Sequence, residues 1–238
     1  MLLVNSGTLR GIARILKIHP DTVARHLEVQ AVLAREELAQ QIAGAPKASH
    51  LQLDDLITIE HTKLKQVSIT LVCDANRYRM MGACVSRIPT SGINAAKARE
   101  KYGPRPDQSI ENRGKLLERV APFIADNALI VTDEHSAYPS LIEAHCPKRV
   151  HQTHASKKAC VAGQGEMKEG GFDPLFCINH QLASFRALIS RLVRRTWTTT
   201  KKCERLEDHV MILMAYYNRC RRPKSARVYE AEFDGVAG

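Results

Sequence analysis

The spacing of hydrophobic residues changes from helical to strand-like near residue 48 of this 238-residue chain. Before that point, apolar residues recur at helical spacing over 9–16 and again from residue 20, where Pro20 suits the first turn of a new helix. The apolar positions are Leu9, Ile12, Ala13 and Leu16 in the first helix, and Val23 and Leu27 in the second. Two helices joined by a tight turn form a helix-turn-helix. A further helix is expected over 29–47, so we predict a helix-turn-helix segment at 1–47.

From residue 48 onward the pattern predicts three strands first and then a mixture of helices and strands. The strands are expected at 51–59, 67–73, 78–85, 128–132 and 149–151, and the helices at 109–125, 139–144, 181–195 and 205–217. This order is that of an RNase H-like fold, an α/β architecture in which helices flank a mixed sheet. We predict such a domain over 48–222, followed by a C-terminal tail at 223–238.

The chain is strongly basic, with a net charge of +10 and an isoelectric point near 9.4. An excess of this size favours a polyanionic partner, with nucleic acid before an anionic membrane. The sequence contains no apolar stretch long enough to cross a bilayer and no signal peptide, so we expect a cytoplasmic, nucleoid-associated protein. The seven cysteines are scattered without CxxC pairs, which is typical of free thiols in a reducing compartment.

The second helix of the predicted helix-turn-helix projects Thr22, Arg25 and His26, and Arg25 is the strongest candidate for a contact to DNA. An ordinary helical hairpin has the same pattern. The basic charge of the chain favours DNA binding.

Two aspartates occupy strand positions that suit a metal site. Asp54 lies in the first predicted strand of the larger domain, and Asp133 ends the fourth. These strands are neighbours in an RNase H-like sheet, so the two carboxylates could meet at one edge. A divalent cation relieves the repulsion between close carboxylates, and Mg²⁺ prefers such oxygen ligands. The alternative is that both are ordinary polar residues at the ends of strands.

Short motifs in a specific order resemble those of DDE-type transposases, in the bacterial class that includes insertion sequence 1. The first is Leu53-Asp54-Asp55 followed by Ile59-Glu60-His61-Thr62-Lys63, and the second is Thr132-Asp133-Glu134 with Tyr138-Pro139. Two further motifs of this chain resemble the family's central loop, namely Gly163-Gln164-Gly165-Glu166 and Gly171-Phe172-Asp173-Pro174-Leu175-Phe176. Residues similar to those of the family's last catalytic helix are Asn179-His180, Arg186, Arg191-Leu192 and Arg194-Arg195-Thr196-Trp197. The family's terminal motif is matched by Tyr216-Tyr217-Asn218. The resemblance therefore covers most of the chain.

This resemblance implies a catalytic site that holds two Mg²⁺ or Mn²⁺ ions. Asp54 and Asp133 match the family's two aspartates. The family's third residue is usually Glu, but the matching position here is Asn179, whose carbonyl oxygen can bind a metal without charge. Glu166 is the competing candidate, 33 residues after Asp133 but in the Gly-rich loop. The implied partners are the double-stranded DNA of the element ends and of the target, bound by a homo-oligomer.

Other residues of the last helix suit contacts with phosphate. Arg186, Arg191, Arg194 and Arg195 are expected to form a basic row at helical spacing, either a solvated face or a phosphate clamp. His180 could position a phosphate or transfer a proton, or be structural. Trp197 is expected to cap the core, with stacking on a base as the alternative.

A zinc site at Cys146, His151, His154 and Cys160 is not predicted, because these residues lack the close pairs of structural zinc sites.

Three functions remain. The first is a transposase, which cleaves strands at the element ends and joins them to target DNA. The second is a DNA-binding regulator or decayed transposase without catalysis, and the third is a nuclease without strand joining.

Overall fold

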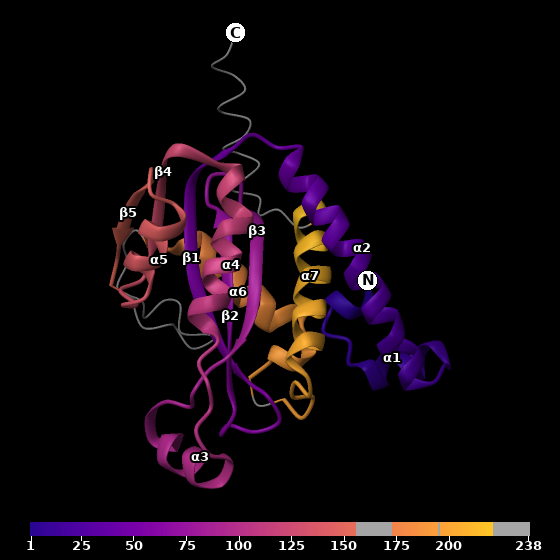
Figure 1. Cartoon of the computed structure of the whole chain (residues 1–238). Coiled ribbons are helices and arrows are strands. Elements are labelled where there is room, and N and C mark those ends of the chain that lie inside the picture. Colours follow the sequence, from indigo (N-terminus) through magenta and orange to yellow (C-terminus); the bar gives the residue numbers. More distant parts are fainter. Residues whose placement is uncertain (156–172, 195, 221–238) are drawn as a thin grey trace.

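The computed structural model describes residues 1–155, 173–194 and 196–220 (Figure 1). Its strands are β1 (Ala48–Ile59), β2 (Gln66–Asp74), β3 (Arg79–Arg87), β4 (Ile124–Thr132) and β5 (Val150–Thr153). Its α-helices are α1 (Leu9–Leu16), α2 (Pro20–Ala43), α3 (Ala95–Tyr102), α4 (Ser109–Val120), α5 (Tyr138–His145), α6 (Phe176–Leu188) and α7 (Cys203–Cys220). Short 3-10 helices lie at Leu2–Val4, Gly92–Asn94, Ala121–Phe123 and Ser190–Leu192.

The five strands form one mixed sheet in the order β3-β2-β1-β4-β5. The first three make an antiparallel meander, whereas β4 and β5 run parallel to β1. The chain is therefore of the predicted α/β class, with a mixed sheet flanked by helices and preceded by N-terminal helices. All five predicted strands are present, and β4 begins four residues earlier than expected, at Ile124 instead of residue 128.

Alternating side chains of the strands feed two separate hydrophobic cores. On one face, residues such as Ile69 and Leu71 of β2 pack with α6 and α7. On the other face, residues such as Leu53 of β1 and Ile130 of β4 pack with α4 and α5. Because successive side chains of a strand point to opposite faces, neighbouring residues on β1 enter different environments.

Two helices joined by a short turn precede the sheet, α1 at Leu9–Leu16 and α2 from Pro20. Thr8 caps α1 by accepting a hydrogen bond from Gly11 N–H, and Lys17 ends the helix in the left-handed region, with φ of 54°. The predicted second helix and the helix expected over 29–47 are one continuous element, α2. It packs along α7 (Figure 1), and Arg35 forms an ion pair with the partly buried Asp208 of that helix.

Three helices differ from the sequence-based expectation, and the one expected over 109–125 ends at Val120, before Ile124 begins β4. The helix expected over 181–195 begins at Phe176 and ends at Leu188, because Ile189 is extended and buried and the chain continues in a 3-10 turn. The sequence pattern did not predict α3, which follows β3 and lies apart from the sheet (Figure 1). Among the described helices, none is long and apolar enough to span a membrane.

Candidate metal and DNA site

Asp54 and Asp133 lie at matching positions on neighbouring parallel strands. Leu53 of β1 is paired with Thr132 of β4, so the next residue on each chain is one of the two aspartates. Both carboxylates are partly exposed to solvent. The sheet register therefore brings together the two acids that the sequence singled out, although 78 residues separate them in the chain.

The environment of Asp54 is unfavourable for a negative charge. Burial raises the pKa of Asp54 to about 7, and the nearby charge of Asp133 adds to this rise. A hydrogen bond from Asp55 N–H to Asp54 Oδ1, at 2.6 Å, acts in the opposite direction and is outweighed. A bound cation would stabilise the charged form of Asp54, which burial and the second carboxylate make unfavourable.

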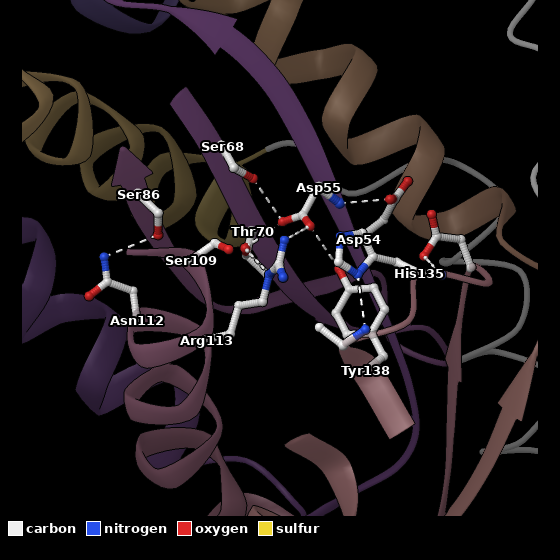
Figure 2. Close-up of polar contacts among 12 residues, drawn as sticks. Asp54, Asp55, Ser68, Thr70, Ser86, Ser109, Asn112, Arg113, His135 and Tyr138 are labelled. Atoms are coloured by element: carbon white, nitrogen blue, oxygen red, sulfur yellow. Dashed lines mark hydrogen bonds and ion pairs between the residues drawn. The ribbon is translucent and has the colours of Figure 1, made fainter. Parts of the chain in front are cut away.

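Asp55, the next residue, faces the other side of the sheet and is fully engaged there (Figure 2). Its carboxylate accepts hydrogen bonds from Ser68 at 3.0 Å, from Thr70 at 2.5 Å and from the Tyr138 hydroxyl at 3.2 Å. It also forms an ion pair with Arg113 of α4, whose side chain is only 5% exposed. Asp55 therefore joins β1, β2, α4 and α5 and has little capacity left for a metal.

Sequence reasoning missed Gln52, which fixes the beginning of α6 against the same face of β1 as Asp54. Its side chain is buried and donates to the carbonyl of Pro174 at 2.8 Å, while its oxygen accepts from Ile178 N–H at 2.9 Å. Asn179 follows Ile178 in the first turns of α6. The signal in the sequence is a glutamine between the apolar residues Leu51 and Leu53, two positions before Asp54 and therefore on the same face of the predicted strand.

Asn179 is exposed, and its side-chain amide donates to the Asp173 carboxylate at 3.2 Å. This contact turns the amide nitrogen toward Asp173 and leaves the carbonyl oxygen of Asn179 without a hydrogen-bond partner within the described residues. Glu166, the competing third candidate, lies outside the described residues. Across the described segments, no three His, Cys, Asp or Glu side chains are arranged to hold a metal ion.

The donors at this site fit Mg²⁺ or Mn²⁺ by their chemistry. Asp54 and Asp133, which the strand register brings together, offer carboxylate oxygens, and Asn179 at the start of α6 offers an amide oxygen; hard cations prefer such donors. Two carboxylates and one amide give fewer charges than three acids, so the described residues alone would hold a cation less firmly than an all-acid set. The raised pKa of Asp54 is the observation that supports a cation here.

The basic residues predicted for the last helix are in different environments. Arg186 donates to the carbonyl of Ile57 at 3.2 Å, and burial together with the nearby charge of Arg194 lowers its pKa. Arg191 is partly buried close to Asp208 and His209 of α7. The predicted helical row is therefore wrong as a geometric feature, because the helix ends before Arg191.

His180 contacts aromatic neighbours. Its ring stacks on Phe176, with 6.0 Å between the centroids, and its Nδ1 lies 3.4 Å from the Tyr217 hydroxyl. Desolvation of the ring lowers the pKa of His180. Arg195 lies outside the described residues.

At the N-terminal helices, Thr22, Arg25 and His26 are all exposed on α2, as a DNA-contacting helix requires. Trp197 is 98% exposed, so the expectation that it caps the core is wrong. Cys146 is buried in the core that α4 and α5 share, and Cys160 lies outside the described residues. No protein-family model matches this chain, and no curated protein has significant similarity to it.

Proposed function

We propose that this protein is a transposase of the DDE type that cleaves and joins DNA strands with the help of divalent cations. The observation that supports the proposal is that Asp54 and Asp133 directly follow the paired residues Leu53 and Thr132 of two parallel strands, with the pKa of Asp54 raised by burial and by its acidic neighbour. The order of strands and helices is compatible with an RNase H-like fold, which we propose as the finer description of the sheet.

In this proposal, Asp54, Asp133 and Asn179 hold two Mg²⁺ or Mn²⁺ ions. When bound, the ions would supply charge neutralisation at the phosphate and activation of the attacking oxygen. Water first attacks a phosphodiester at the element end and releases a 3′-hydroxyl. That hydroxyl then attacks a phosphodiester of target DNA, and one P–O bond forms for each that breaks.

The other residues of the site would orient the DNA and the metal-binding groups. Gln52 fixes the start of α6 and so positions Asn179 relative to β1. Arg186 and Arg194 place positive charge near Ile57, three residues beyond Asp54 along β1, where a phosphate could bind. The exposed residues Arg25, Thr22 and His26 would contact the element ends, and a homo-oligomer would hold two ends together.

The test is cleavage of duplex DNA copied from the segments that flank this reading frame, in Mg²⁺ or Mn²⁺ and in EDTA. We expect cation-dependent cleavage and strand transfer by the wild-type protein, loss of both in Asp133→Asn, and a large reduction in Asn179→Ala. DNA binding measured in EDTA should persist in both variants, because neither removes a cationic side chain.

The outcomes separate the proposal from its alternatives. DNA binding without cleavage by the wild type would contradict the proposal and favour a regulator or decayed transposase. Cleavage without joining would favour a nuclease. Cleavage that survives Asn179→Ala but not Asp133→Asn would keep the function and assign the third position to Glu166 or another group.

A further inference from the structure

A cleft of about 590 Å³ lies beyond the end of β1, between the sheet and α3. It is lined by the strand-end residues Glu60, Lys65 and Arg87 and by the α3 segment, which contributes Arg99, Tyr102 and Arg105. We call the cationic members of this set, Lys65, Arg87, Arg99 and Arg105, the basic cleft. Neither the composition of the chain nor the motif resemblance assigned a role to residues 88–106.

The basic cleft has more positive charge than its single acidic lining residue can compensate. Glu60 pairs with Arg105 at 2.8 Å and with Arg87 at 3.5 Å, and Arg87 also reaches the exposed Glu204 at 3.0 Å. The other amino group of Arg105, Nη1, is buried without a hydrogen-bond partner among the described residues. Lys65 and Arg99 form no ion pair within the described part of the chain, so the cleft is suited to an anion.

The outer surface of α3 extends this positive charge into solvent. Lys97, Arg99 and Lys101 are exposed, and the ammonium groups of Lys65 and Lys101 lie 4.4 and 5.6 Å from the centroid of the Tyr102 ring. Over 88–106, Ala98 is the one buried side chain, so the segment adds little to the hydrophobic core. With three exposed cations against one exposed acid, Glu100, and almost no core, α3 carries a net positive charge on its surface.

Figure 1 shows α3 beyond the end of the sheet toward which β1 runs, and the cleft at this end is lined by Glu60, the residue directly after β1. Asp54 and Glu60 are six residues apart along the chain, which in an extended strand is about 20 Å. A DNA duplex rises 3.4 Å per base pair, so this distance corresponds to about six base pairs. The same duplex could therefore contact both places.

We propose that the basic cleft and the exposed cations of α3 bind the phosphate backbone of duplex DNA, about six base pairs from the phosphate at Asp54 and Asp133. The choice of DNA as the anion rests on the proposed function. The contact is independent of base sequence, because ammonium and guanidinium groups here meet phosphates and not base edges.

The test compares two triple variants that remove the same charges from opposite ends of the sheet. The first is Lys97→Gln, Arg99→Gln, Lys101→Gln on α3. The control is Lys47→Gln, Arg119→Gln, Lys148→Gln; these exposed residues precede the parallel strands β1, β4 and β5, at the ends where those strands begin. Fluorescence anisotropy with a duplex of about 30 base pairs, several times the roughly six base pairs between the two sites, is measured in EDTA over a series of salt concentrations.

We expect the negative slope of log K against log salt to become shallower by about 1 to 3 in the α3 variant, since each phosphate contact contributes about −0.9 to it. The control variant should keep the wild-type slope, and both should keep the wild-type melting temperature. Equal losses in the two variants, or an unchanged slope in the α3 variant, would overturn the inference. Because binding is measured without divalent cations, a wild-type protein that binds through α3 but never cleaves would refute the proposed function alone.

Discussion

The adjacent residues Asp54 and Asp55 should have opposite effects on stability, because only Asp55 has a compensating cation. In metal-free protein the pKa of Asp54 rises from 3.8 to about 7 on folding. The folded state then binds its proton more tightly than the unfolded state does, so stability falls as the pH rises from about 4 to 7 and stays low above 7. Three pKa units correspond to about 4 kcal/mol, an upper limit for a side chain that keeps some contact with water.

Replacement of Asp54 by Asn removes the charge and keeps both the size of the side chain and an oxygen that can accept from Asp55 N–H. We expect metal-free Asp54→Asn to exceed the wild type in unfolding free energy by up to about 4 kcal/mol at pH 8, and by only about 1 kcal/mol at pH 4.5. Asp55→Asn is the matched control. It leaves the buried Arg113 without its counter-charge, so it should destabilise the protein by about 3–5 kcal/mol.

Urea denaturation in EDTA, followed by circular dichroism at both pH values, measures these differences. Equal stabilities of Asp54→Asn and the wild type at pH 8 would refute the reasoning, as would a difference that does not change with pH. Addition of Mg²⁺ should stabilise the wild type more than Asp54→Asn, because a ligand that binds only the folded state shifts the unfolding equilibrium.

Three further predictions test the frame around the site. Burial lowers the pKa of His209 to about 4, so its contribution to stability, full above pH 6.5, should be lost as the pH falls toward 4; wild type and His209→Asn should converge by about 3 kcal/mol in urea titrations between these values. Gly82→Ala should cost about 1–3 kcal/mol in thermal unfolding, because a Cβ there would lie 2.7 Å from the buried Leu116. Trp197→Ala should change the unfolding free energy by less than about 0.5 kcal/mol, whereas a larger loss would show that the ring packs inward.

The acidic pair was predictable from the sequence because strand periodicity is strong around it. Spaced apolar positions identified β1 and a continuous apolar run identified β4; Asp54 lies within β1 and Asp133 directly follows β4. The same periodicity shows that Asp54 and Asp55 face opposite sides, but not which side contains Arg113. That cation is 58 residues away, and only the packing of α4 brings it to Asp55.

The parts that escaped prediction have little periodic signal, or signal of the wrong kind. In α3 a single buried residue, Ala98, gives no apolar stripe, and a helix without a stripe cannot be recognised by its spacing. Beyond Leu188 the opposite happens. Ile189 and Leu192 are buried and continue the helical spacing, although the backbone has left the α-helix. Apolar spacing records which residues are buried, and a 3-10 turn can bury them as well as a helix does.

The distribution of charge along the sheet gives the proposed site a direction. Asp54 and Asp133 follow the paired residues Leu53 and Thr132, and the cations proposed to bind phosphate lie farther along β1. Arg186 reaches Ile57 there, and the bridge between Glu60 and Thr200 brings the loop with the exposed Trp197 to the same end. A protein stabilised only by its core would gain nothing from separating acids and cations in this way, because pairing them would be more favourable. The separation favours binding of a polyanion that extends along β1, because the cations attract its phosphates while the two acids remain available for a metal ion.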